Sequence, residues 1–276
     1  MNRTRHHLSQ ALIYLILIAG ALWSLFPFVW MVLSSLKGYV EASAAASLLP
    51  KNWLWSNYVE AWNQVDIFPR YFFNTILIAT MTVLGVLITS SLASYAFASM
   101  RFPGREVLFF VLLSTMMVPF EVTLVPNFIM IRRLGWIDHY QAMIIPWAAS
   151  AFSIFLLRQF FRAIPSDLRD AAVIDGCTHL RYLWSIVLPL SKPALVTSAL
   201  FTFLGSWNSL MWPLLVTNDP LLRPIQVGIA AFIKDAGTQV QLLMAAVTIS
   251  VIPVILIYLL LQRWFIEGIA TVGIRG

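Results

Sequence analysis

The segment Ile164-Pro-Ser-Asp-Leu-Arg-Asp-Ala-Ala-Val-Ile-Asp-Gly176 lies in the most polar part of an otherwise apolar chain. It predicts a short helix with defined ends. Ser166 is the candidate N-cap residue, because its hydroxyl can accept a bond from an unpaired backbone N–H. Asp167 and Asp170 fall in the first turn, where the helix dipole favours acidic groups, and Gly176 is the expected stop. The residues that then share one face, with two alanines that let another protein approach closely, are Leu168, Ala171, Ala172 and Asp175.

A second short helix is expected directly after Gly176. Thr178 can cap it, and Pro189 is expected to end it. Its apolar stripe follows i, i+3, i+4, i+7 spacing and consists of Leu180, Leu183, Trp184 and Val187. Two interpretations are open for this helix pair: a knob that docks on a partner, or two amphipathic helices that lie on a membrane surface.

Outward from this segment the chain is strongly apolar. Of its 276 residues 60% are hydrophobic and 11% are charged, with a mean hydropathy of +0.82. Soluble domains carry about 25% charged residues, so these values exclude a water-soluble enzyme and a disordered chain. A membrane-crossing helix needs about 20 apolar residues, and six stretches qualify: Ala11–Leu36, Tyr71–Ala98, a run from Val107 that is interrupted near Pro119, Gln141–Leu157, Pro193–Val216 and Leu242–Gln262. The expected class is an all-α integral membrane protein, since the runs exceed a barrel strand of about ten residues.

The distribution of cations predicts the orientation. The first apolar run is longer than a signal-peptide core of about 7–15 residues, so it is interpreted as an uncleaved span. With both termini in the cytoplasm, eleven of the eighteen Lys and Arg residues lie inside and seven outside, which agrees with the positive-inside rule. The expected organisation is an N-terminal part at residues 1–70, a core at 71–263 that includes the polar helix at 165–178, and a cytoplasmic tail at 264–276.

No metal or nucleotide is expected on this chain. Cys177 is the single cysteine, and the four histidines have no i,i+4 spacing. The phosphate-binding pattern G-x-x-x-x-G-K-[ST] is absent from the sequence. With so few charges overall, the net charge of +6 indicates a membrane protein rather than a nucleic-acid partner.

Polar residues inside apolar runs are candidates for a solute pathway, because they are costly in lipid. The densest group is Ser206, Trp207, Asn208 and Ser209, which can either line a pathway or hydrogen-bond a neighbouring helix. Glu121, which follows Pro119, is either a gate or pairing residue or a group at the outer interface. Pro119 and Pro126 together are expected to break the helix there. Asn74 is a further candidate, although a structural role is favoured for it.

The polar segment resembles the "EAA" signature of ABC importer permeases. The match consists of Asp170-Ala-Ala172, three residues, Gly176, nine residues, and Ile186-Val-Leu-Pro189. It departs from the family once, with Asp170 where Glu is usual. The chain is further similar to the carbohydrate, maltose-type branch, and specifically to its smaller permease subunit, in Arg101-Phe-Pro-Gly104, Phe155–Phe161, Trp207-Asn208 and the ending Gln262–Gly276.

This resemblance implies a type I importer permease with six transmembrane helices in the bacterial inner membrane. It implies a second, homologous permease subunit, a separate ABC ATPase dimer that binds ATP and Mg, and a periplasmic or lipid-anchored solute-binding protein. The implied function is half of a translocation pathway for a sugar or sugar-like solute. The residues implied in ATPase coupling are Asp167, Asp170, Ala171, Ala172, Asp175, Gly176, Ile186 and Pro189.

The tail is expected to contact the ATPases as well. Trp264–Gly276 is too polar and too rich in glycine to extend the last membrane helix, which predicts an extended or loosely helical strip. The resemblance implies that this strip inserts between the two ATPases. The residues concerned are Glu267, Gly268, Gly273 and Arg275.

Three other functions stay open at this point. One is a permease for a non-sugar solute, such as a phosphodiester or a polyamine. Another is a channel or secondary transporter, which would leave the polar helix pair unexplained. The third is a membrane-embedded enzyme, which would need clustered titratable groups, whereas Glu121 stands alone in its span.

Overall fold

The computed structural model describes residues 2–44, 47–63, 68–230, 232–233 and 238–273, and every regular element in these ranges is a helix. The helices belong to two compact units. Unit 1 comprises Met1–Phe68 with Ile229–Ile252, and unit 2 comprises Pro69–Gly228 with Pro253–Gly276.

The described helices hold up to six candidate membrane spans. Three are single helices: Leu12–Ser35 within α1 (Asn2–Ser35), all of α4 (Phe68–Ser99), and Val240–Trp264 within α15 (Val240–Gly273). Three more are bent pairs, namely Arg105–Met117 with Phe120–Arg133, Tyr140–Trp147 with Ala151–Arg162, and His179–Leu190 with Lys192–Trp207, bent by 99°, 41° and 83°. Counted as one span each, the pairs give the number expected from the sequence.

In unit 1 a folded segment closes the end of α1. The short helices α2 (Tyr39–Ala44) and α3 (Ser56–Asn63) follow α1 in the chain. Asn57 Nδ2 donates to the carbonyls of Ser35 and Lys37, at 2.7 and 2.8 Å, and so satisfies acceptors that the end of a helix leaves unpaired. The Lys37 side chain is buried, and its ammonium lies 4.7 Å from the centre of the Trp30 ring.

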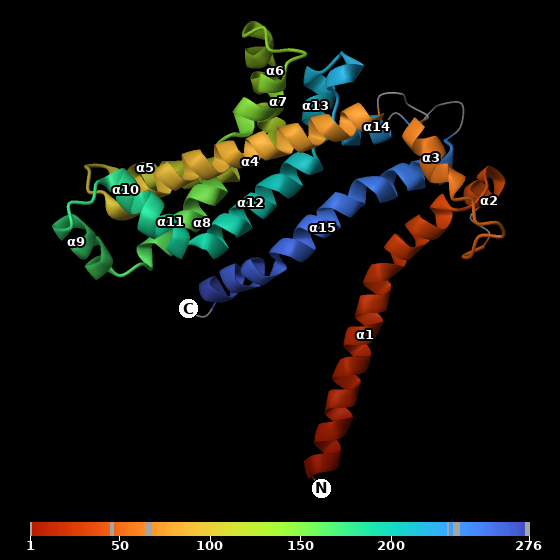
Figure 1. The fold of residues 1–276 in the computed structure, drawn as a ribbon, viewed down its shortest axis with the longest axis horizontal. Coiled ribbons are helices and arrows are strands. Elements are labelled where there is room, and N and C mark those ends of the chain that lie inside the picture. The colour runs from red at the N-terminus through yellow and green to blue at the C-terminus, as the bar shows by residue number, and fades with distance from the viewer. Residues whose placement is uncertain (1, 45–46, 64–67, 231, 234–237, 274–276) are drawn as a thin grey trace. The chain divides into compact units, whose positions relative to one another are not determined.

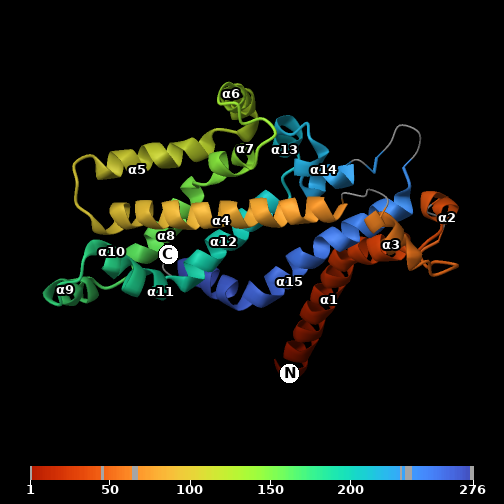
Figure 2. The same cartoon turned by 45° about the horizontal axis from the view of Figure 1, so that its top comes forward.

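In unit 2 the helices α4, α8 (Ala151–Arg162) and α12 (Lys192–Trp207) run side by side (Figures 1 and 2). Small and hydroxyl-bearing residues let them approach closely, as is common between membrane helices. Ser94 Oγ donates to the carbonyl of Ile154, and Ser198 Oγ donates to Ser153 Oγ at 2.7 Å. Most of the remaining elements of unit 2 gather at the two ends of these helices.

One end of unit 2 is built from α6 (Phe120–Arg133), α7 (Tyr140–Ile144), the 3-10 turns η2 (Ile145–Trp147) and η4 (Pro220–Leu222), α13 (Met211–Val216) and the start of α14 (Ile225–Ala230). The other end is built from α9 (Ser166–Ile174), α10 (His179–Tyr182), the π-helical turn η3 (Leu183–Val187) and α11 (Leu188–Leu190). Helix α5 (Arg105–Ser114) and the turn η1 (Thr115–Met117) connect the first end to the second (Figure 2).

Two expected helix boundaries are wrong. The predicted fifth run does not continue to Val216 as one helix, because α12 ends at Trp207 and α13 begins only at Met211. The predicted break near Pro119 is confirmed, but Pro126 lies inside α6 instead of breaking it. Pro126 is exposed, so the carbonyl that its missing N–H leaves unpaired lies on an open face of the helix.

The tail also differs from the expectation. Helix α15 does not stop at Gln262 but continues through Gly273, although the candidate span within it ends at Trp264. Glu267, Gly268 and Gly273 thus lie on the last turns of a helix, so of the two expected forms, extended and loosely helical, the structure shows a helical one. Arg275 lies outside the described residues.

Candidate functional site

The polar segment folds into the expected short helix, α9, with one correction at its start. Pro165 occupies the N-cap position, and Ser166 is the first helical residue rather than the cap. The hydroxyl of Ser166 donates instead to Asp167 Oδ1, at 3.4 Å. No side chain caps the start of α9, and the N–H of Leu168 donates to the carbonyl of Pro165, at 3.3 Å.

The end of α9 is confirmed at Gly176. Its φ of +69° lies in the left-handed region that favours glycine. The N–H of Cys177 donates to the carbonyl of Ala172, and the N–H of Gly176 donates to that of Val173, at 2.8 and 3.0 Å. This pair of bonds is the Schellman motif, which closes the helix and fixes the direction of the chain that follows.

Most of the surface of α9 is free. Asp167, Asp170, Ala171, Asp175 and Gly176 are exposed. The apolar side chains of Val173 and Ile174 are 63% and 86% exposed, which is unusual for residues of this size. Helix α9 therefore presents acidic and apolar groups together on one protruding helix.

One expected contact residue of α9 faces inward. Ala172 is buried in a core cluster of this chain, which includes Tyr182 and Leu183. Its small side chain allows α9 to pack closely on the chain that follows it. The expectation that both alanines face a partner is therefore wrong for Ala172, whereas Ala171 remains exposed.

The second short helix begins as predicted but does not end at Pro189. Thr178 Oγ1 accepts from the backbone N–H of Arg181, at 3.4 Å. The π-helical turn η3 carries the chain into α11, and the break follows at Ser191. Pro189 lies near the start of α11, directly after this turn, and does not end the helical path.

The predicted apolar stripe of this second helix is divided between core and surface. Leu183 and Val187 are buried, while Leu180 and Trp184 are each 60% exposed. Of the two remaining expected coupling residues, Ile186 is half-buried against the core cluster and Pro189 is exposed.

Side-chain bonds tie this end of unit 2 to helix α4. Arg169 of α9 donates to the carbonyl of Ser99, at 2.6 Å, and the hydroxyl of Tyr95 lies 2.9 Å from Nδ1 of His179. A displacement of α9 therefore acts directly on the end of a long core helix. Sequence reasoning missed these bonds, because the partners are about 70 or more residues apart.

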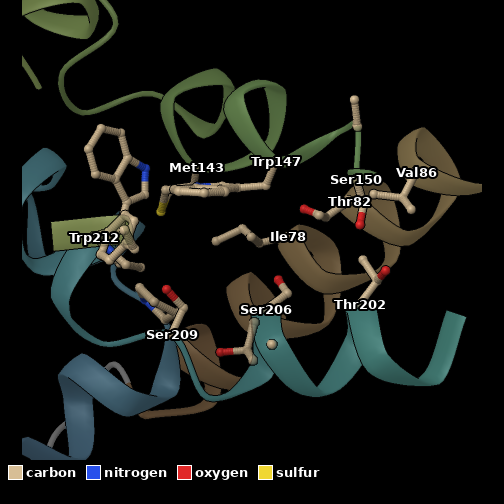
Figure 3. A pocket seen from close by; sticks show the side chains of 16 residues that line it. Ile78, Thr82, Val86, Met143, Trp147, Ser150, Thr202, Ser206, Ser209 and Trp212 are labelled. Carbon is tan, nitrogen blue, oxygen red and sulfur yellow. The ribbon is translucent and has the colours of Figure 1, made fainter. Parts of the chain in front are cut away.

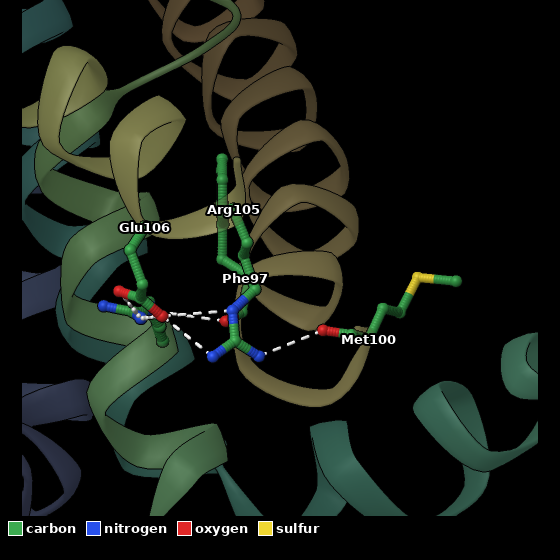
Figure 4. Close-up of polar contacts among 5 residues, drawn as sticks. Phe97, Met100, Arg105 and Glu106 are labelled. Carbon is green, nitrogen blue, oxygen red and sulfur yellow. Dashed lines mark hydrogen bonds and ion pairs between the residues drawn. The ribbon is translucent and has the colours of Figure 1, made fainter. Parts of the chain in front are cut away.

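A second missed group joins three helices next to α9 (Figure 4). Arg158 of α8 is 4% exposed and donates to both carboxylate oxygens of Glu106, at 2.9 and 2.8 Å. Its guanidinium also lies 3.8 Å from the centre of the Phe109 ring and donates to the carbonyl of Phe97. Arg105 pairs with the same carboxylate, at 2.8 Å. The group holds the ends of α4, α5 and α8 together.

Unit 2 also contains a cavity of about 400 Å³ (Figure 3), within the range typical of small-molecule sites. Its walls come from α4, the α6–α8 region, α12, α13 and the residue before α14. The lining residues are Thr75, Ile78, Thr82, Val86, Phe120, Met143, Trp147, Ala149, Ser150, Thr202, Gly205, Ser206, Ser209, Trp212, Pro213 and Pro224. None of these described side chains is charged, and hydroxyls and two indole rings supply the polar and aromatic groups.

The structure separates the predicted pathway residues. Ser206 and Ser209 line the cavity. Trp207 is buried beside Phe72 and Phe203, with ring centres 5.7 and 5.2 Å away.

The other predicted pathway residues lie away from the cavity lining. Asn208 is exposed, and its amide donates to the carbonyl of Leu204 of its own helix. Glu121 is exposed in the first turn of α6. Asn74 is buried and bonded to two backbone carbonyls and to Tyr140, which agrees with the structural role favoured for it.

The remaining polar lining residues were missed, although part of the signal was present in the sequence. Thr75, Ile78, Thr82 and Val86 are spaced by three and four residues, so they form one helix face with regularly placed hydroxyls inside an apolar run. Ser150 and Trp147 come from the break within a bent pair, whose position the sequence did not indicate. Within the described residues, no three His, Cys, Asp or Glu side chains are grouped to hold a metal ion.

Comparison with known proteins identifies the family. Residues 85–271 match the model for the binding-protein-dependent transport system inner membrane component. The chain belongs to this family. It is a permease subunit of an inner-membrane ABC transporter and not an enzyme.

Relatives match this permease over nearly its whole length. It is 36% identical to the sn-glycerol-3-phosphate transport system permease protein UgpE of Yersinia enterocolitica, over 93% of this chain and 94% of that protein. It is 33% identical to the arabinooligosaccharides transport system permease protein AraQ of Bacillus subtilis, over 91% of each chain.

Solved structures agree with the fold. A chain of a bacterial ABC transporter involved in the import of the acidic polysaccharide alginate matches with a TM-score of 0.86 and 26% identity, over 96% of this permease and 99% of that chain. The expected type I importer permease fold is therefore confirmed.

Proposed function

We propose that this permease forms half of a translocation pathway, together with a second homologous permease subunit. In this assembly an ABC ATPase dimer binds ATP and Mg, and a periplasmic or lipid-anchored solute-binding protein delivers the solute. Support comes from the family. A bacterial alginate ABC transporter solved in complex with an alginate pentasaccharide-bound periplasmic protein contains a chain of the same fold, at a TM-score of 0.68 and 15% identity.

The observation that carries the proposal is the exposed, rigid helix α9. Its ends are fixed by Pro165 and by the Schellman bonds at Gly176, and Arg169 ties it to α4. A helix held in this way transmits force, whereas a loop would deform. We infer that the surface formed by Asp167, Asp170, Ala171, Asp175 and Gly176, extended by Val173 and Ile174, docks on the ATPase. Ala172 and Ile186 support this surface from within the chain, and the exposed Pro189 is a further proposed contact.

The same mechanism requires the α9 end of unit 2 to face the cytoplasm. Both termini then lie in the cytoplasm as well, in agreement with the excess of cations in the inside segments. The last turns of α15, with Glu267, Gly268 and Gly273, and the following Arg275 reach the ATPases in this arrangement.

A sugar or sugar-like molecule is the proposed solute. The relatives are named for sn-glycerol 3-phosphate and for arabinooligosaccharides, and the structural match is named for alginate. All three are polyhydroxylated compounds or derivatives of them. Hydroxyls and aromatic faces are the groups that bind such molecules, and the cavity supplies both.

Reconstitution tests the proposal. The complete complex in proteoliposomes should take up a radiolabelled solute from a panel of sugars and sn-glycerol 3-phosphate only when the binding protein, the ATPase and ATP are all present. Complexes with ATP replaced by a non-hydrolysable analogue are the control. Uptake that proceeds without ATP would instead indicate a channel or secondary transporter.

A further inference from the structure

We propose that the cavity of unit 2 is a binding site for one unit of an uncharged sugar, with Thr82 and Ser206 as hydrogen-bonding residues. The inference rests on the proposed function, because it names where and how this subunit itself holds the solute. It adds that this permease is more than a scaffold for the ATPase contact.

The hydroxyl of Thr82 is the first evidence. Thr82 is 2% exposed, and its Oγ1 has no hydrogen-bond partner among the described residues. Figure 3 shows this oxygen turned toward the interior of the cavity. A buried hydroxyl without a partner destabilises a fold, so a ligand that supplies the missing bond binds with that energy in its favour.

Thr75, on the same wall, differs from Thr82 because its hydroxyl is bonded within the chain. Thr75 Oγ1 donates to the carbonyl of Tyr71 at 2.8 Å and accepts from the N–H of Ile225 at 2.7 Å. The Thr75 hydroxyl therefore both donates and accepts a hydrogen bond within the chain. The hydroxyl of Thr82, about two turns further along α4, is left for another molecule.

The groups opposite Thr82 complete a site for a ring with hydroxyls. Ser206 and Thr202 approach from α12, and Trp147 lies edge-on above Ile78 in Figure 3, so that a face of its indole is turned toward the cavity. Trp147 is held there by Phe120 and Trp212, whose ring centres lie 5.5 and 5.9 Å away. A sugar ring offers hydroxyls at its edge and C–H groups on its face, which matches this arrangement.

The absence of charge among the described lining residues selects an uncharged ligand. A carboxylate or phosphate moved into this cavity would lose hydration without gaining a cation, and a polyamine would gain no carboxylate. A neutral sugar has no such cost. The relatives named for charged solutes would then bind the charged group through other subunits or other residues.

The experiment compares three cavity variants with a matched control on α4, the helix that carries Thr82. Thr82→Val keeps the shape and removes the hydroxyl, Ser206→Ala removes a second one, and Thr82→Ser retains the bond. Ser90→Ala is the control, because Ser90 Oγ on α4 is also buried without a partner but does not line the cavity. The complete complexes are held in nanodiscs without the binding protein. Binding of neutral mono- and disaccharides is measured, with sn-glycerol 3-phosphate and an alginate disaccharide as charged probes.

Wild type is expected to bind a neutral sugar and neither charged probe. Thr82→Val and Ser206→Ala should each weaken that binding by about three- to tenfold, the loss of one hydrogen bond, while Thr82→Ser and Ser90→Ala leave it within twofold. Equal binding by wild type and Thr82→Val, preference for a charged probe, or no binding of any neutral sugar overturns the inference. ATP-driven uptake by the same wild-type complex, measured in proteoliposomes, tests the proposed function separately.

Discussion

Asp138 joins two loops at the end of unit 2 opposite to α9. Its carboxylate accepts bonds from the backbone N–H groups of Asn218 and Asp219 and from the side-chain amide of Asn218. These bonds, first that from Asp219, lower the pKa of the Asp138 carboxyl below its usual value. Because the folded pKa is the lower one, the ionised carboxylate stabilises the fold above the unfolded value of about 4, and this stabilisation is lost as pH falls through the folded pKa.

Asp138→Asn should therefore flatten the acid limb of the stability curve. Asparagine tolerates the left-handed φ of 59° at this position, so the backbone is retained. The melting temperature of wild type should fall more between pH 5 and pH 3 than that of the variant. Asp175→Asn, which removes a carboxylate at the end of α9, is the control. Parallel curves for wild type and Asp138→Asn would contradict this role.

Substitutions of Asp170 test whether a single carboxylate of α9 contributes to docking on the ATPase. Asp170→Glu should support transport, because the carboxylate is kept. Glutamate is also the usual residue at this position of the motif that the segment resembles. Asp170→Lys should lower ATP-driven uptake about tenfold, which corresponds to a lost contact of about 1.4 kcal/mol. Its effect on the melting temperature should be small, because Asp170 is exposed and, contrary to the expectation from the sequence, lies beyond the first turn of α9, where the helix dipole acts weakly. If both variants transport equally, the charge has no part in docking.

At the scale of helices, α4 and the break before α8 approach each other closely at Gly85. A Cβ at Gly85 would lie 2.8 Å from Cβ and 3.2 Å from Cα of Ala148. Because the Cα belongs to the backbone, it cannot move aside cheaply. Gly85→Ala should therefore destabilise the permease by about 1–3 kcal/mol, the usual cost of overpacking. Thermal unfolding of the purified complex measures this.

The partner residue supplies the matching control for Gly85. Ala148→Gly in the same chain should restore part of the lost stability by removing the opposing methyl group. Gly20→Ala in α1, where a Cβ would meet nothing within 4 Å, should not destabilise the permease, since alanine favours a helix over glycine. A Gly85→Ala variant as stable as wild type would show that the two segments separate easily.

The helices also show which boundaries a sequence can specify. Pro119 and Gly176 act through their own backbone geometry, so the break and the stop at these positions could be predicted. The roles of Ser166 and Pro189 depend on what surrounds them. Pro165 occupies the N-cap position of α9 in place of Ser166, and the π-helical turn η3 leads directly into α11, which contains Pro189. At such positions the residue type favours a helix start or stop, but the packing around it decides where the helix begins or ends.

At the scale of the whole chain, the family follows from local sequence features, whereas the cavity depends on packing. The apolar runs and the spacing from Asp170 to Pro189 are local features, so the membrane class and the permease family could be predicted from them. The cavity could not, because Thr82, Trp147 and Ser206 meet only when α4, η2 and α12 pack together. Sequence reasoning found the polar group near Ser206 but could not tell which of its members turn inward.

The length of α15 leads to the last prediction. Its 34 residues correspond to about 51 Å of helix measured along the chain, at 1.5 Å per residue, which is more than a hydrocarbon layer of about 30 Å requires. The candidate span within it ends at Trp264, so the turns that follow form a helical extension outside the apolar layer. A helix that continues rigidly from a span can carry its end residues to the ATPases more directly than a loose strip.

Removal of residues 271–276 should therefore lower ATP-driven uptake while membrane insertion is retained, because every candidate span ends before residue 271. Insertion is measured by alkaline extraction, and uptake is measured in proteoliposomes at equal amounts of complex. A variant in which a Gly-Ser segment of equal length replaces these residues separates lost contacts from lost length. Since glycine and serine cannot supply the contacts, that variant should be as impaired as the truncation. Full uptake by the truncated chain would mean that the end of α15 takes no part in coupling.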